Sequence, residues 1–163
     1  MTQGPIRRIL VFIDGSEESL VAIEYSILLT RVVHARLLGA YVVNTRALSD
    51  LRKTHIFLAA EEAEYARDIE EDAHRYLEHA TRTAASKGVE IETIKTSGSV
   101  HQELLQIIEE KDIDLLVIGE LAHVRSRLDE FNNESERLMR SAPCSVLIVK
   151  DEDRVDDLFT LED

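Results

Sequence analysis

The first strand and helix of the chain are encoded by Ile9-Leu-Val-Phe-Ile-Asp-Gly-Ser16. Its five apolar residues form a short run rich in β-branched side chains, which is typical of a strand buried on both faces of a sheet. Gly15 permits the tight backbone geometry of a turn, and Ser16 is a residue type that caps helix N-termini. Apolar residues then recur with helical spacing from Leu20 to Leu28. This stretch therefore predicts a buried strand, a turn and a helix in succession.

The same alternation continues through the rest of the chain. Four later segments have strand character: Leu37–Val43, Glu90–Thr96, Leu115–Ile118 and Val146–Val149. The second of them is the least apolar and suits a position near a sheet edge. Helical patterns lie between the strands, and the longest covers about residues 61–86 and ends before Gly88, a left-handed cap. Five strands alternating with four helices predict an α/β fold with a five-stranded parallel sheet and helices on both faces.

Length and composition limit the organisation of the chain. Its 163 residues are typical of one domain, and an apolar content of 44% is sufficient for a core. We assign residues 1–150 to this domain and residues 151–163 to an acidic C-terminal tail. The tail is expected to be flexible, or to dock its apolar residues Leu158, Phe159 and Leu161 into a groove.

Charge excludes several classes of partner. The chain has 19 Lys and Arg against 32 Asp and Glu, a formal net charge of −13. Phosphate backbones and anionic membranes repel such a surface, so neither nucleic acid nor a membrane is an expected partner. The acidic face of the long helix, Glu61–Asp72, is either solvated or binds a basic protein partner. Because no apolar run resembles a membrane span or a signal peptide and Cys144 is the single cysteine, we expect a cytoplasmic protein.

Sequence patterns of catalysis are absent. There is no Gly-x-Ser-x-Gly nucleophile turn and no P-loop, and the six histidines show no spacing typical of metal ligands. Cys144 follows Pro143 at the head of an apolar strand, where a small buried residue is expected. We therefore expect no enzyme activity, no catalytic residue and no metal site.

Ligands of open parallel sheets bind beyond the carboxyl ends of the strands, where the strand order reverses. Three short segments of this chain lie there: residues 14–16, 97–99 and 119–133. Asp14 either organises a turn or accepts a hydrogen bond from an amine or a sugar hydroxyl. The run from Ser99 to Gln102 is interpreted as a capping box, with Gly98 making the bend before it. The connection Asn44–Ala60 is also long, and loops of that length are often functional or mobile.

Three motifs make the chain resemble the universal stress protein family. They are Ile9–Ser16, Asp114–Gly119, and Glu136–Leu138 leading into Ser141–Val149. The resemblance covers nearly the whole chain, and it implies a Rossmann-like three-layer sandwich of the adenine nucleotide alpha hydrolase-like type. It also implies a homodimer formed through the last strand, which comprises Ser145, Val146, Leu147, Ile148 and Val149.

Members of this family that bind ATP carry a glycine motif whose backbone surrounds the phosphates: Gly, two residues, Gly, nine residues, then Gly followed by Ser or Thr. In the family, residues that match Asp14 and Val42 approach the nucleoside. This chain keeps Gly119, and its other three motif positions are Ala122, Asn132 and Asn133. Ala122 adds a methyl group, and a left-handed backbone there would cost about 1–2 kcal/mol. Asn133, with Glu136 three residues later, still supplies a helix cap.

Charge in the same segment also disfavours phosphate. Arg125 and Arg127 are outnumbered by five acids, namely Glu120, Asp129, Glu130, Glu134 and Glu136. The sequence therefore predicts a non-enzymatic stress-response or signalling module with lost or weak ATP binding and no cofactor. The alternative is an adenine-nucleotide switch or weak ATPase that binds ATP with Mg²⁺ through a remodelled loop, in which the two arginines contact the phosphates. An enzyme of another doubly wound family is not supported, because the sequence offers no nucleophile or base.

Overall fold

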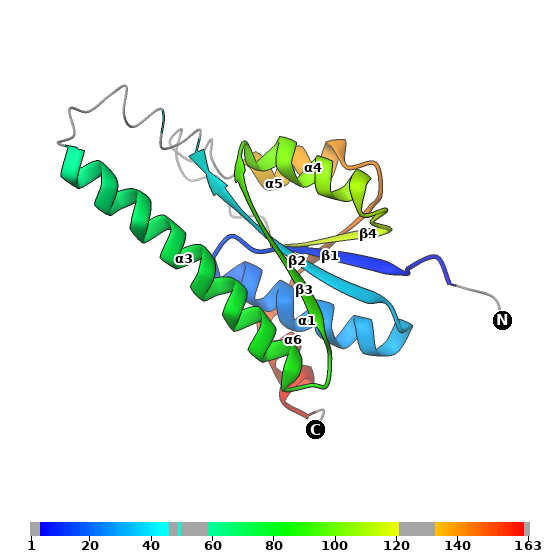
Figure 1. Cartoon of the computed structure of the whole chain (residues 1–163). Helices are drawn as coiled ribbons and strands as arrows, with labels where there is room; N and C mark the ends of the chain where they lie inside the picture. Colours follow the sequence, from blue (N-terminus) through cyan, green and yellow to red (C-terminus); the bar gives the residue numbers. More distant parts are fainter. Residues whose placement is uncertain (1–3, 46–48, 50–58, 121–132, 162–163) are drawn as a thin grey trace.

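The computed structural model describes residues 4–45, 49, 59–120 and 133–161. Within these residues, five parallel strands form one sheet in the order β3-β2-β1-β4-β5 (Figure 1). The strands are β1 (Arg8–Phe12), β2 (Arg36–Asn44), β3 (Ile91–Gly98), β4 (Leu115–Gly119) and β5 (Ser145–Val149). The predicted α/β fold is confirmed, and the mixed segment that was expected near a sheet edge is the edge strand β3.

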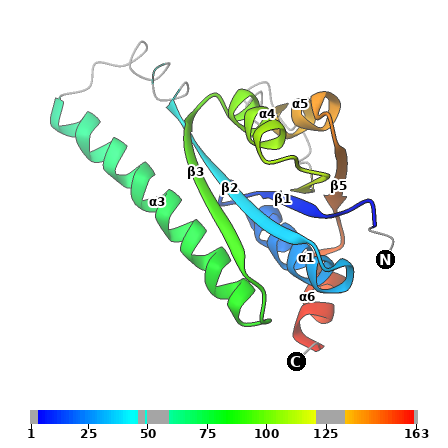
Figure 2. The same cartoon turned by 45° about the vertical axis from the view of Figure 1, so that its right-hand side comes forward.

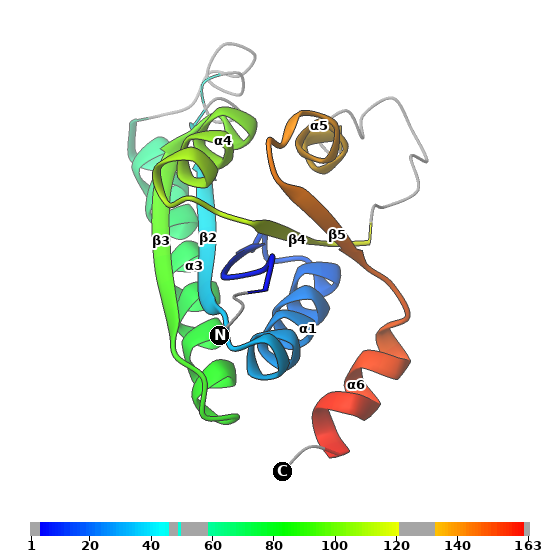
Figure 3. The same ribbon diagram turned by 90° about the vertical axis from the view of Figure 1, so that its right-hand side faces the viewer.

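Helices cover both faces of the sheet. They are α1 (Glu17–Val33), α3 (Ala59–Ala85), α4 (Val100–Glu110), α5 (Asn133–Ser141) and α6 (Glu152–Leu161). Figure 3 shows α1 and α6 on one face of the sheet and α4 with α5 on the other. Alternate residues of β1 therefore face two cores: Ile9 and Val11 belong to the α1-side core, and Leu10 and Phe12 to the α4-side core.

The longest helix, α3, runs along β2 and β3 on the same side of the sheet as α1 (Figure 2). It spans 27 residues, in agreement with the helix expected over about 61–86. Its buried face consists of Ala73, Leu77, Ala80 and Ala84, and small residues there let the helix lie close to the sheet. Gly88 follows its end with φ +71°, as expected of a left-handed cap. No described helix, α3 included, is long and apolar enough to cross a membrane.

The first turns of α1 and α4 are capped differently. Ser16 caps α1 as predicted, because its Oγ accepts a hydrogen bond from the backbone N–H of Ser19 at 3.1 Å. Ser99 occupies the equivalent position before α4, but it makes no side-chain cap hydrogen bond. The predicted capping box is therefore wrong. The side chain that turns back over the bend at Gly98 is that of Glu103, one residue beyond the position that a capping box uses.

The C-terminal segment forms a docked helix, α6, which packs against α1. Val155 is fully buried in the α1-side core, and Phe159 packs on the same core one turn later. The expectation of a flexible tail is therefore wrong for residues 152–161, and the alternative of docking applies. The reason is the four-residue spacing of these two apolar side chains, which places both on one face of the helix. Leu158 and Leu161, which were also candidates for docking, are exposed.

Candidate functional site

The strand order places a topological switch point between β1 and β4. The chain leaves β1 through α1 on one face of the sheet and reaches β4 through α4 on the other face (Figure 3). In open α/β sheets, the crevice beyond the carboxyl ends of two such strands is where ligands bind. The segment 14–16, directly after β1, and Gly119, the last residue of β4, both lie at this edge.

The structure brings three of the predicted site residues to this edge. Asp14 follows β1, Val42 lies near the end of the neighbouring strand β2, and Gly119 ends β4. Phe12 pairs with Ala40, so the chain beyond β1 runs level with the end of β2. The side chain of Val42 is buried in the α4-side core, and its backbone pairs with Thr96 of β3.

The remaining predicted positions are only partly described. Ala122 and Asn132 lie outside the described residues, as does most of the connection Asn44–Ala60. Asn133 begins α5, which agrees with a helix start there. The cap expected from the Asn133 side chain falls outside the described part of the structure.

The Asp14 carboxylate organises the turn between β1 and α1. Its Oδ1 accepts two hydrogen bonds from Ser16, one from the backbone N–H at 2.9 Å and one from the hydroxyl at 2.5 Å. The backbone N–H of Asp14 points to the hydroxyl of Ser19 at 3.4 Å. Asp14 nevertheless remains exposed, so its carboxylate is accessible at the edge of the sheet. The turn is therefore formed before any ligand arrives.

An aromatic stack covers the α3 side of this turn. Gly15 has φ +84°, and a Cβ on it would lie 2.6 Å from Cε2 of Tyr76 in α3. Tyr76 stacks on Tyr41 of β2, with ring centroids 6.0 Å apart, and the Arg75 guanidinium lies 5.4 Å from the Tyr76 centroid. Burial, and next the carboxylate of Asp72, raise the pKa of the Tyr41 hydroxyl. Side-chain packing therefore fills this side of the edge with two tyrosines.

Sequence reasoning missed this stack as a unit. Tyr76 was part of the apolar stripe of the long helix, and Tyr41 was part of a strand. The alternation of side chains along β2 was the available signal, because it places Tyr41 and Leu37 on the face that α3 covers.

Gly119 is packed directly against the first turn of α1. A Cβ at this position would lie 2.5 Å from the carbonyl oxygen of Glu18 and 2.6 Å from its carbonyl carbon. These are backbone atoms, which cannot move aside as a side chain does. The absence of a side chain at Gly119 is therefore required by the packing of α1 on β4, independently of any ligand.

The described surroundings of the crevice are acidic. Glu17 and Glu18 lie in the first turn of α1, where they already occupy the positive end of the helix dipole. A small hollow of about 70 Å³ beside β5 is lined by four acids and one cation: Glu18, Glu120, Asp151, Glu152 and Lys150. A nucleotide phosphate would meet net negative charge there. Among the described residues, no three His, Cys, Asp or Glu side chains gather to hold a metal ion.

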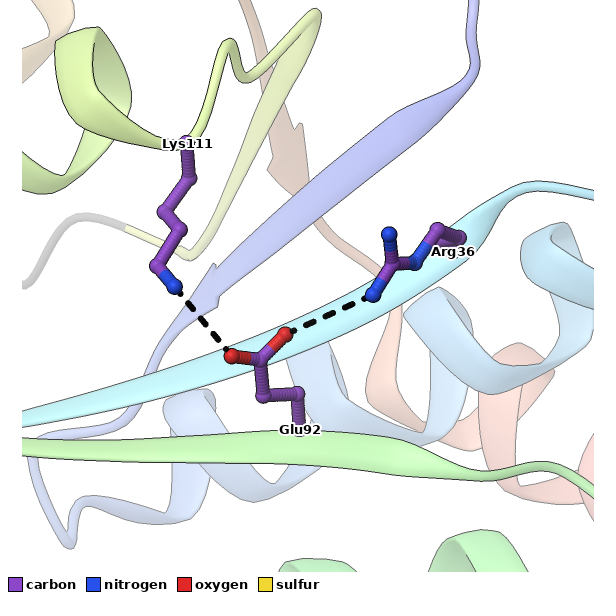
Figure 4. A network of polar contacts seen from close by, with 3 residues as sticks. All are labelled: Arg36, Glu92 and Lys111. Carbon is purple, nitrogen blue, oxygen red and sulfur yellow. Dashed lines mark hydrogen bonds and ion pairs between the residues drawn. The ribbon is translucent and has the colours of Figure 1, made fainter.

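The opposite, amino edge of the sheet has a different character. Glu92 of β3 joins Lys111 at 3.3 Å and Arg36 of β2 at 3.8 Å (Figure 4). All three side chains are largely exposed, so this network adds little to stability. A hollow of about 980 Å³ also lies at this edge, bordered by Thr30, His34, Arg36, Thr81 and Gly88. It lies at the opposite edge of the sheet from the switch point, between the C-terminal ends of α1 and α3.

One serine–histidine pair joins α4 and α5, but its geometry does not suit catalysis. His101 Nε2 lies 2.7 Å from the hydroxyl oxygen of Ser141. The same hydroxyl donates its proton to the backbone carbonyl of Arg137 at 2.5 Å. Because the proton is already committed, the histidine cannot take it, and the pair connects two helices instead. Sequence reasoning did not identify it, since the two residues are 40 positions apart.

Comparison with known proteins shows which family this chain resembles. The sequence model of the universal stress protein family matches residues 5–150. Universal stress protein YxiE of Bacillus subtilis is 28% identical over 145 residues, covering 88% of this chain and 98% of the relative. Universal stress protein MJ0531 of Methanocaldococcus jannaschii is 26% identical over 144 residues, covering 88% of this chain and 82% of the relative.

Solved structures share the fold. A universal stress protein family member from Burkholderia pseudomallei superimposes with a TM-score of 0.68 at 23% identity, covering 90% of this chain and 97% of that one. A family protein from Arabidopsis thaliana with AMP bound superimposes with a TM-score of 0.65 at 15% identity, covering 91% of this chain and 94% of that one. A universal stress protein from Archaeoglobus fulgidus in complex with dAMP superimposes with a TM-score of 0.60 at 11% identity, covering 89% of this chain and 98% of that one. The family match over most of the chain and the agreement in fold lead to one conclusion: this chain belongs to the universal stress protein family.

Proposed function

We propose that the protein is a homodimeric, non-enzymatic stress-response or signalling module of the cytoplasm, with lost or weak ATP binding and no cofactor. The observation that carries this proposal is the acidity of the described surroundings of the crevice. Glu17 and Glu18 lie in the first turn of α1, and the hollow beside β5 is lined by four acids and one cation. These acids oppose a polyanionic ligand.

The alternative is an adenine-nucleotide switch, and one observation favours it. Asp14, Val42 and Gly119 lie at the same edge of the sheet, and the carboxylate of Asp14 is exposed there. Related folds have been solved with AMP and with dAMP bound. In this alternative, Ala122, Asn132 and Asn133 belong to a remodelled phosphate loop, and Mg²⁺ accompanies the ATP.

Isothermal titration calorimetry with ATP and Mg²⁺ separates the two functions. We expect no binding heat at millimolar ATP for the wild-type protein. Micromolar affinity that Asp14→Ala abolishes would contradict the proposal and establish the switch. The matched control is Glu109→Ala, an exposed acid on α4 that leaves the switch point untouched. Loss of affinity in the Asp14 variant but not in the control would assign the binding to this edge.

The homodimer is proposed to form through β5. This strand pairs with β4 on one side and forms the edge of the sheet on the other. Its central side chains, Val146, Leu147 and Ile148, are only half-buried. An apolar edge strand with open backbone groups tends to pair with another chain unless it is covered. A second copy of the same strand is the partner that the proposal assigns to it.

Two substitutions in β5 test the dimer by sedimentation equilibrium. Leu147→Pro removes a backbone N–H, and Val146→Lys places a charge in the same edge, so both are expected to shift the protein to monomer. Val32→Lys is the control, because Val32 is 75% exposed on α1, and it should remain dimeric. Circular dichroism identifies the variants that are still folded. Folded β5 variants that sediment as intact dimers would refute the assignment of this strand.

The acidic face of α3 offers a further partner surface only in part. Glu70 already pairs with Lys95 of β3 at 2.6 Å, and Asp72 pairs with Arg75 at 2.6 Å. These contacts favour a solvated face with pairs inside the chain over a dedicated surface for a basic protein.

A further inference from the structure

The docking of α6 on α1 combines an apolar contact with an acidic one. The apolar part is Val155, which is fully buried, together with Phe159, which packs on the same core. The ammonium of Lys87, just beyond α3, lies 4.7 Å from the centroid of the Phe159 ring. Figures 1 and 3 show α6 beside α1 at the end of the chain. The family model matches residues 5–150, and α6 begins at Glu152, beyond that match.

The acidic part of the interface is centred on Glu24 of α1. Its Oε2 is buried from solvent and has no hydrogen-bond partner among the described residues. The carboxyl group of Asp156 in α6 is close enough to act on it. A buried carboxylate oxygen without a donor is costly to leave ionised, and more so beside a second carboxylate. The docked arrangement of α6 therefore favours the protonated form of Glu24, which can donate a hydrogen bond to Asp156.

The charges around Glu24 all favour the protonated form of its carboxyl group. Burial, and next the hydrogen bond and charge of Asp156, raise the pKa of Glu24 from 4.5 to about 7, and Glu152 of α6 adds to the effect. Among the described residues of the other elements packed on α1, namely β1, β2, β4, β5 and α3, no charged group contributes to this change. At the start of α6, Glu152 itself faces Glu17 and Glu18 of α1, so the neighbouring groups are acids as well.

We propose that α6 is a proton-controlled latch, held on α1 while Glu24 and Asp156 share a proton and released when both carboxylates are ionised. Release separates an acid pair that repels, and it uncovers Val155 together with the part of α1 beneath it. Leu147 of β5 packs on the same core as Val155, so the change occurs next to the edge strand. The direction of the pH dependence follows from proton uptake. The docked state binds a proton that the released state does not hold near neutral pH, so the docking of α6 weakens as pH rises.

Amide hydrogen exchange of residues 152–161 in the intact protein measures the latch. After correction for the intrinsic exchange rate, we expect the protection of α6 to fall roughly tenfold or more between pH 5 and pH 8, because each pH unit between the two pKa values changes docking by up to tenfold. Glu24→Gln keeps a hydrogen-bond donor for Asp156 but does not titrate, and it should make the protection independent of pH. Glu109→Gln, an exposed control on α4, should retain the wild-type profile.

Carbon-13 NMR of the Glu24 carboxyl group provides a second readout that needs no variant. A titration midpoint near 7 supports the latch, and a midpoint near 4.5 overturns it. Protection of α6 that is constant from pH 5 to pH 8 in the wild type also overturns it. So does a pH-dependent loss of protection that persists in Glu24→Gln.

Discussion

At the scale of single residues, the most constrained contact at the switch point is the one between Gly119 and α1. Replacing Gly119 by Ala forces a methyl group against the backbone of Glu18, and it should destabilise the protein by about 1–3 kcal/mol through overpacking. The free energy of unfolding, measured with urea, tests this. Gly4→Ala is the control, because a Cβ there meets nothing within 4 Å. Equal stability of the two variants would show that α1 does not pack on β4 as described.

Single residues also show what sequence can and cannot reveal. The cap at Ser16 was predictable because a helix start is a local property of a few neighbouring residues. The packing of Gly119 was not, since it joins two residues about a hundred positions apart. The capping box predicted at Ser99 was wrong because the sequence does not show which nearby side chain turns toward the first backbone N–H groups of a helix. The family resemblance assigned Gly119 to phosphate binding, which stays a prediction, and the structure adds a packing role against α1.

At the scale of elements, α6 adds a layer of contacts beyond the family domain. Val155→Ala should lower the free energy of unfolding by about 2 kcal/mol, because it removes two buried methyl groups and leaves a cavity. Leu161→Ala lies in the same helix, but its side chain is 81% exposed, so this control should change stability little. Urea unfolding of both variants at pH 5, where the latch is closed, measures the difference. A Val155 variant as stable as the Leu161 control would contradict the docking of α6.

The elements themselves were largely predictable, and their contacts were not. Four strands follow from short apolar runs, β3 follows from a mixed segment, and α3 follows from a stripe of apolar residues with helical spacing. α6 was missed because its apolar residues are few and stand among acids, which is also the composition of a disordered tail. Its docking joins residues that lie far apart in the sequence, and no local pattern signals contacts that the tertiary fold creates.

At the scale of the whole molecule, the net charge of −13 is unevenly placed. Acids surround the switch point and the start of α6, whereas the amino edge of the sheet carries the mixed network of Arg36, Glu92 and Lys111. The described acids near the crevice oppose a nucleotide phosphate, as the acids of the segment 119–133 do in the sequence. That the protein binds no nucleotide stays a prediction, and the structure adds the acids of α1 and α6 that lie nearby.

We propose that the protein works as a dimer without a bound adenine nucleotide. Native mass spectrometry of the wild-type protein, purified without added ligand and then incubated with ATP and Mg²⁺, tests the dimer and the absence of nucleotide together. We expect a species at twice the 18.5 kDa of the chain, with no added mass before or after incubation. A monomer, or a species that carries the mass of an adenine nucleotide, would contradict it.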